Sequence, residues 1–223
     1  MKRMSVFALC FAVLCLSNAN AAITIDYSYS MAADGTLTTA NSWAIVDNFD
    51  SGRPGWNYTG NGSIVNGSAS GLYAAPYNST LMSGPDATDY FTTPIDNTVL
   101  WSMVDFGGTT YNYLGLFWGS VDEYNQVEFL NNGVVVPNGS WTGTQVLSPS
   151  EANGNQTAPS TNLYVNFYDV PDFDAVRFTS FSGYGGSSPF AFELDNLAVI
   201  PAPGALMLSI IGLGAIRRLR LRR

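Results

Sequence analysis

The chain has 223 residues, of which 46% are hydrophobic and only 12% are charged. It contains no His, and its two Cys, Cys10 and Cys15, both lie in an N-terminal apolar run. Once that run is removed, Ser–His and Cys–His nucleophile pairs are excluded. Zinc catalysis without His or Cys ligands would be very unusual, and no phosphate loop or dinucleotide fingerprint occurs.

The positive charges gather at the two ends of the chain. Lys2 and Arg3 lie at the start and five Arg at the end, which leaves only Arg53 and Arg177 between them. All 17 Asp and Glu lie in that interior. Because it offers no surface that neutralises phosphates, nucleic acid is not an expected partner. This acidic interior is compatible with divalent cations, which prefer carboxylate and carbonyl oxygens as ligands.

Residues 1–21 predict a secretory signal peptide. Lys2 and Arg3 form its positive start, and the apolar run over residues 5–16 is too short to span a bilayer. Ala19 and Ala21 supply the small residues that signal peptidase requires, so we expect cleavage before Ala22. The chain is therefore predicted to be exported.

Residues 22–199 predict one β-rich domain without a convincing amphipathic helix. Short apolar runs alternate with turn residues throughout, and Asn132-Gly133 between two such runs predicts a hairpin. The expected strands cover residues 23–29, 99–104, 113–118, 126–130, 134–136, 163–168, 175–180 and 190–194. Strands at this spacing predict an all-β antiparallel β-sandwich or jelly roll, flanked by the N-terminal signal helix and a short C-terminal apolar helix. Residues 52–71, rich in Gly, Asn and Ser, are expected to form long loops.

Aromatic residues of the domain divide into two predicted groups. Trp101, Phe117 and Trp118 are expected to fill the core. The second group can stack on a sugar ring, and several of its members lie beside Gly, Asn or Pro: Trp56, Tyr58, Tyr73, Tyr77, Trp141 and Tyr184. Trp56 and Trp141 are the chosen candidates for glycan contact. This second group makes a carbohydrate-binding module one interpretation of the domain.

Two acidic patterns raise further alternatives. Asp122, Glu123 and Glu128 are the nearest carboxylate cluster for a glycoside hydrolase, although adjacent residues of a strand face opposite sides. The second pattern is a weak candidate Ca²⁺ site, formed if the first and last strands lie side by side. Its ligands would be Asp47, Asp50, Glu193 and Asp195. The alternative interpretation is a simple turn at residues 50–52 and a strand-end cap at Asp195. The sequence predicts neither an enzyme nor a required cofactor.

Residues 200–223 form a tail in three parts. Pro201, Ala202 and Pro203 are a rigid, non-helical start, and residues 205–216 are an uncharged apolar segment. A helix of that length measures about 18 Å, short of the ~30 Å hydrocarbon core. A basic cluster follows, made of Arg217, Arg218, Arg220, Arg222 and Arg223. By the positive-inside rule, these Arg stay cytoplasmic and stop transfer through the inner membrane.

This tail resembles the PEP-CTERM sorting signal, with Ala202 where that family usually has Glu. The run over residues 113–125 and the runs over 163–167 and 191–198 also resemble blocks of exosortase-dependent surface proteins. The resemblance implies cleavage by a membrane-embedded exosortase in bacteria that make extracellular polysaccharide, and it carries no catalytic residues. A plain membrane anchor is the alternative interpretation of the tail.

The sequence therefore predicts an exported surface or extracellular-matrix protein with a structural or adhesive role linked to exopolysaccharide or biofilm. Its partners would be signal peptidase, exosortase, extracellular polysaccharide and, before processing, the inner membrane. A lectin-like carbohydrate-binding module is the first alternative, and a glycoside hydrolase is the second. The predicted location is the cell surface, after transient anchoring by the C-terminus.

Overall fold

The computed structural model describes residues 22–50, 54–94, 99–181 and 191–203. Strands in antiparallel sheets dominate this part of the chain, which confirms an all-β fold. Its one α-helix is the short α1, Gly143–Val146, and no helix there is long and apolar enough to cross a membrane. The predicted signal helix and apolar tail helix lie outside the described residues.

The larger sheet has seven strands in the order β1-β12-β9-β14-β7-β6, and β4 pairs with the second half of β14. Their bounds are β1 Thr24–Asp26, β12 Leu163–Tyr168, β9 Tyr111–Gly119, β14 Phe192–Pro201, β7 Asp89–Thr93, β6 Ser63–Asn66 and β4 Ile45–Asp47. The predicted strand over residues 113–118 is confirmed as part of β9, which lies between β12 and β14. Its nearly continuous apolar sequence follows from burial on both faces.

The smaller sheet has five strands in the order β11-β10-β13-β8-β5. Their bounds are β11 Val134–Thr142, β10 Asn125–Asn131, β13 Ala175–Ser180, β8 Trp101–Asp105 and β5 Asn57–Gly60. The predicted hairpin is confirmed, because β10 and β11 pair directly across Asn132 and Gly133. Both turn residues have positive φ, 50° and 77°, which is the backbone that an Asn-Gly turn supplies at low cost.

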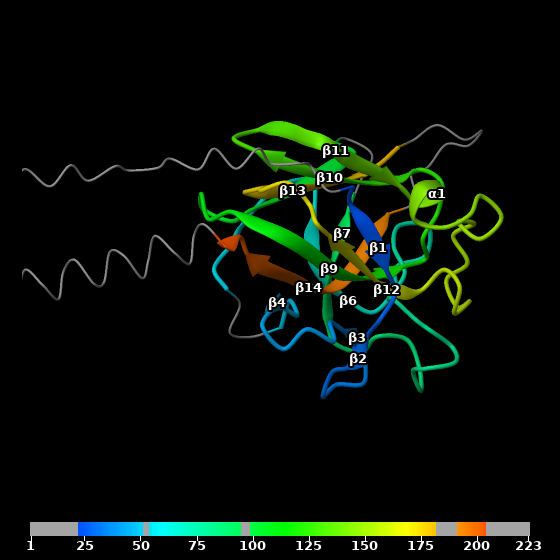
Figure 1. Cartoon of the computed structure of the whole chain (residues 1–223). Helices are drawn as coiled ribbons and strands as arrows, with labels where there is room; N and C mark the ends of the chain where they lie inside the picture. The colour runs from blue at the N-terminus through cyan, green and yellow to red at the C-terminus, as the bar shows by residue number, and fades with distance from the viewer. Residues whose placement is uncertain (1–21, 51–53, 95–98, 182–190, 204–223) are drawn as a thin grey trace, which may run out of the picture.

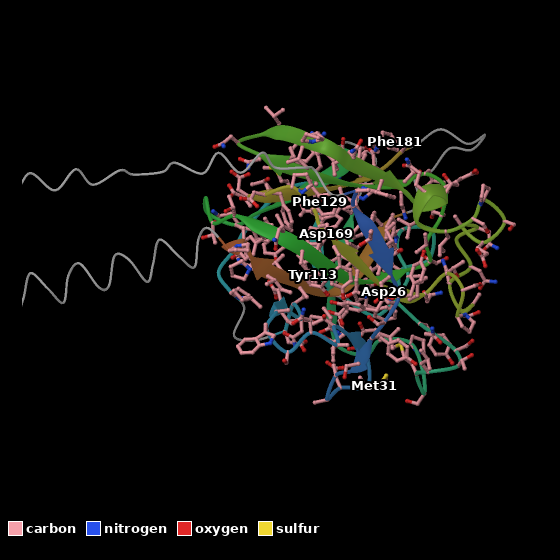
Figure 2. All side chains as sticks on the ribbon, viewed as in Figure 1. Asp26, Met31, Tyr113, Phe129, Asp169 and Phe181 are labelled. Atoms are coloured by element: carbon pink, nitrogen blue, oxygen red, sulfur yellow. The ribbon has the colours of Figure 1, made fainter. Side chains whose placement is uncertain are left out.

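Aromatic side chains fill the space between the two sheets. Phe129 and Phe178 reach from the smaller sheet to Phe167 and Phe192 of the larger one, at ring-centroid distances of 5.3 and 5.2 Å. Trp118 stacks on Phe192 at 4.3 Å and is fully buried. In Figure 1 the two sheets lie one above the other, and Phe129, labelled in Figure 2, lies between them.

A third layer covers the opposite face of the larger sheet. It consists of the hairpin of β2, Ser30–Met31, and β3, Leu37–Thr38, together with the loop over residues 67–88. Leu37 and Met82 of this layer pack on Phe117 and Tyr164 of the sheet. Figure 1 places β2 and β3 on the far side of the larger sheet from β10 and β11. We call residues 30–39 and 67–88 together the outer layer.

Two expectations from the sequence were wrong. Residues 52–71 contain β5 and β6, one in each sheet, where long loops were predicted. Trp101 is 39% exposed, because the register of β8 turns Ser102 and Val104 inward and the alternating residues outward. Phe117 and Trp118 are fully buried, as predicted.

Candidate functional site

A polar cleft of about 640 Å³ lies where the outer layer meets the larger sheet. The loop over residues 68–74, the turn after β9, the loop over residues 153–156 and the start of β14 form its walls. Side chains that can donate or accept hydrogen bonds line it, chiefly Tyr73, Ser120, Asp122, Tyr124, Gln156 and Glu193. We call this the acidic cleft.

Glu193 reaches the cleft because β14 alternates between its two faces. Its neighbours Phe192 and Leu194 belong to the core between the sheets, so Glu193 projects to the other side. Only 3% of the residue is exposed. Its Oε1 accepts a hydrogen bond from the Ala74 N–H at 2.9 Å, and its Oε2 accepts one from the Ser120 hydroxyl at 3.0 Å. Burial raises the pKa of Glu193 to about 8.

Asp122 lies in the same cleft, just beyond the end of β9. It is 3% exposed, and its Oδ1 accepts the Asn125 N–H at 3.1 Å. A bridge between Asp122 and Asn153 holds the neighbouring loop in place. Burial raises the pKa of Asp122 to about 8, against the opposing effect of hydrogen bonds from Tyr124 and Asn125. Burial in the cleft therefore favours the protonated form of both carboxyl groups.

The three carboxylates predicted as a glycosidase cluster do not converge. Glu123 is exposed, and Glu128 lies on β10 in the other sheet, where its Oε2 binds Arg177 at 2.7 Å. Asp122 instead lines the same cleft as Glu193, which sequence reasoning did not group with it. The two pKa values move in the same direction, whereas general acid–base hydrolysis needs one protonated and one ionised carboxyl.

A second hollow, of about 490 Å³, is more apolar. Tyr27 and Tyr29 lie in it with 41% and 42% of their surface exposed, near Leu81. The Tyr27 hydroxyl donates a hydrogen bond to the Val146 carbonyl, so that ring is held in place. Asn78 and other polar residues complete its lining.

The two Trp residues predicted to contact glycan line neither hollow. Trp56 is half-buried and packs edge-on against Phe106, with ring centroids 4.9 Å apart. Trp141 is also half-buried, and its indole N–H donates to the Asn138 carbonyl at 3.0 Å. The most exposed Trp is Trp43, at 84%, which sequence reasoning did not select.

The strand that carries Asp47 does pair with the last strand, where Asp47 lies opposite Leu197, but the four side chains proposed for calcium do not form one group. The oxygens of Asp47 accept the Phe49 N–H at 2.9 Å and the Tyr58 hydroxyl at 2.6 Å. Asp50 accepts the Asp89 N–H at 3.1 Å. Glu193 lines the acidic cleft, and Asp195 lies beside Asp86 instead. Within the described ranges, no three His, Cys, Asp or Glu side chains form a group that could hold a metal ion.

The start of the predicted sorting tail is part of the folded body. Pro201 ends β14 opposite Tyr111, and Ala202 is 1% exposed. The Ala202 N–H donates to the Thr110 carbonyl at 3.0 Å, whereas Pro203 is exposed. The body thus continues beyond residue 199, where the sequence placed its end. Ala19, Ala21 and the five C-terminal Arg lie outside the described residues.

No family model, curated protein or solved structure matches this chain. The comparisons thus assign no family, activity or ligand, and a functional proposal must rest on the residues and their geometry.

Proposed function

We propose that this chain is an exported bacterial surface or extracellular-matrix protein, sorted by an exosortase, whose body serves a structural or adhesive role. The observation that carries the proposal is the separation of charge along the sequence. Positive residues mark both ends, and an acidic body without Lys lies between them. A cytoplasmic basic end and an exported acidic body follow from the positive-inside rule.

The packing of Ala202 supports this interpretation of the tail. PEP-CTERM tails usually have Glu at this position, but the side chain here is buried against the body. A Glu would have to lose its water contacts there, and the one described Lys or Arg, Arg177, already pairs with Glu128. The Pro-Ala-Pro variant is therefore compatible with a sorting motif that begins directly at the end of the last strand.

We further propose that the two sheets form a β-sandwich of jelly-roll type whose acidic cleft binds neutral polysaccharide. The cleft offers hydroxyl, amide and carboxyl groups, which suit the hydroxyls of a sugar, and the Tyr73 and Tyr124 rings. This observation favours the carbohydrate-binding alternative over the hydrolase. It also moves the expected contact away from Trp56 and Trp141.

The sorting proposal is tested by mass spectrometry of the protein from its native host. We expect a mature chain that begins at Ala22, lacks the five C-terminal Arg and is found outside the inner membrane. Replacing those Arg with Ser should block processing and leave the tail attached. A full-length cytosolic chain with both ends intact would contradict the proposal, and an exported chain with an uncut tail would identify a plain anchor.

The carbohydrate proposal is tested separately with a panel of immobilised neutral and anionic polysaccharides. Gln156→Ala changes an exposed residue of the cleft and should weaken binding by about tenfold, the effect of losing a hydrogen bond and leaving a partner unsatisfied. Trp141→Ala is the matched control outside the cleft and should leave specific binding unchanged. Equal losses of binding in both variants would place the contact elsewhere. If the protein releases reducing sugar and Asp122→Asn abolishes that release, the protein is a hydrolase.

A further inference from the structure

Two buried carboxyl groups meet at the junction between the outer layer and the larger sheet. Asp86 belongs to the loop over residues 67–88 and is 3% exposed, and Asp195 belongs to β14 and is 0% exposed. The loop is fixed at this point, because the Asp86 N–H donates to the Pro76 carbonyl at 2.9 Å. The two carboxyl groups lie close enough for one to hydrogen bond to the other.

Each of these carboxyl groups has one oxygen that accepts a hydrogen bond from a nearby donor and one oxygen that accepts from no N–H or hydroxyl group among the described residues. Asp86 Oδ1 accepts the Thr88 N–H at 2.9 Å and the Thr88 hydroxyl at 2.6 Å. Asp195 Oδ2 accepts the Asn196 amide at 2.9 Å. Asp86 Oδ2 and Asp195 Oδ1 are buried and find no donor among the described residues. Buried polar atoms normally have a partner, so this pair of orphaned acceptors calls for an explanation.

The surroundings add negative charge and supply no described counter-charge. The charges of Asp34 and Asp50 both act on Asp195, and that of Asp34 also acts on Asp86. The one Lys or Arg among the described residues is Arg177, which pairs with Glu128 on the other sheet. Two buried carboxylates at such close range need a positive charge or a proton between them.

We propose that Asp86 Oδ2 and Asp195 Oδ1 bind a hard divalent cation of the calcium type. Ca²⁺ takes six to eight oxygen ligands in flexible geometry, so neutral oxygens and water can complete a shell that two carboxylates begin. Zinc prefers nitrogen and sulfur ligands, which this part of the chain does not offer. Bound there, the ion ties the loop over residues 67–88 to the last strand.

This site differs from the calcium site that the sequence suggested. It keeps Asp195 but replaces Asp47, Asp50 and Glu193 with Asp86. The replaced residues have donors of their own, whereas the atoms of the new pair have none described. Asp86 lies more than 100 residues before Asp195 in the sequence, and only the folding of the outer layer onto β14 brings them together.

The test uses the full chain in mild detergent, after treatment with a chelator and removal of the chelator. Calorimetric titration with CaCl₂ should show one ion bound per chain. Saturating Ca²⁺ should raise the melting temperature by about 4 °C or more, because the ion binds the folded state. MgCl₂ at the same concentration should have a smaller effect, since Mg²⁺ requires stricter geometry and retains its waters. Absence of Ca²⁺ binding by the wild-type chain would overturn the proposal even if no variant could be purified.

Asp86→Asn and Asp195→Asn should each reduce Ca²⁺ affinity at least tenfold. Asp89→Asn is the matched control, because Asp89 follows Asp86 closely but contacts Asn66 of β6 instead. An equal loss in the control would mean that general negative charge, not this pair, attracts the ion. A proton shared by the pair would instead give a melting temperature that falls with rising pH and ignores Ca²⁺, and this outcome also overturns the proposal. The charges of Asp34 and Asp50 act on Asp195, and that of Asp195 acts on Tyr164, so these three residues are kept unchanged in that comparison.

Discussion

The two faces of the larger sheet bury side chains of different character. The inner face meets the smaller sheet through apolar rings, including Trp118 and Phe192. The outer face meets irregular loops through polar groups, including Glu193, Asp195 and Asn196 of the same strand. The acidic cleft and the orphaned carboxylate pair both lie at the outer face. A face that buries polar groups must satisfy each one individually, which is why ligand sites arise there.

Buried hydrogen bonds attach the outer layer together with its small apolar cluster, whereas the inner face relies on apolar packing. Tyr113, labelled in Figure 2, donates its hydroxyl hydrogen to Asn166 Oδ1 at 2.6 Å and lies 2.7 Å from the Thr39 hydroxyl of the outer layer. Asn166 in turn donates to the carbonyls of Asp26 and Ser28. The two faces should therefore respond differently to mutation, to pH and to ions.

The largest expected effect comes from removing a ring of the inner face. Trp118→Ala should lower the free energy of unfolding by about 3–5 kcal/mol, because it leaves a cavity beside Phe192 in a close-packed core. Trp118→Phe is the matched control and should cost clearly less. It refills part of the space and removes a buried indole N–H that has no described acceptor. Unfolding by denaturant measures the free energy of unfolding of both variants. Equal losses in Trp118→Ala and Trp118→Phe would show that the indole N–H has an essential partner.

On the outer face, Asn196→Ala should lower the free energy of unfolding by about 3 kcal/mol. The Asn196 amide donates to the Thr36 hydroxyl, to the Leu37 carbonyl and to Asp195, and its removal leaves these buried acceptors unsatisfied. The backbone φ of 48° adds a smaller cost, because Asn tolerates this conformation better than Ala.

Asn196→Gly separates the two contributions, since Gly adopts positive φ freely but cannot donate. Amide exchange should become faster in residues 30–39 while the smaller sheet keeps its protection. Faster exchange spread evenly over both sheets would show that the outer layer does not come loose as a separate unit.

The acidic cleft should make stability fall as pH rises. The pKa of Asp122 is about 8 in the folded protein and 3.8 in its ordinary state, so its contribution is complete below pH 3.8 and is lost as pH rises toward 8. The largest slope for one group is ~1.4 kcal/mol per pH unit. We expect a loss of about 2 kcal/mol between pH 5 and pH 8, because water that enters the opened cleft relieves part of the desolvation.

Asp122→Asn should reduce this dependence and leave the contribution of Glu193, because the amide occupies the same space and does not ionise in this range. Asp172→Asn, at an exposed position of a loop, is the control and should leave the slope unchanged. Unfolding by denaturant at several pH values, in the presence of a chelator, measures the slope. A wild-type chain that is more stable at pH 8 than at pH 5 would contradict the raised pKa.

The sequence predicted the inner face far better than the outer one. The period-two and apolar runs that became β9, β10, β12 and β13 carry their own signal, because neighbours in the chain report which face is buried. Glu193 and Asp195, which alternate with Phe192 and Leu194 along the strand, could also have been assigned to one face by the same alternation. Their partners Ala74 and Asp86 could not, because an irregular loop has no period that relates it to a strand more than 100 residues away.

The smallest expected effect is at the surface of the smaller sheet. This surface belongs neither to the apolar inner face nor to the polar outer face of the larger sheet. Both the Nε and a terminal nitrogen of Arg177 lie 2.7 Å from one oxygen of Glu128, with Arg177 34% and Glu128 13% exposed at the side chain. Arg177→Gln should cost less than about 1 kcal/mol, because solvent and salt screen such a pair. The loss should shrink further in 0.5 M NaCl, while the effect of Asn196→Ala should hardly change with salt. Arg177 is the one described cation in a strongly acidic body. A loss of more than about 2 kcal/mol in the free energy of unfolding would mean that it offsets repulsion from more carboxylates than Glu128 alone.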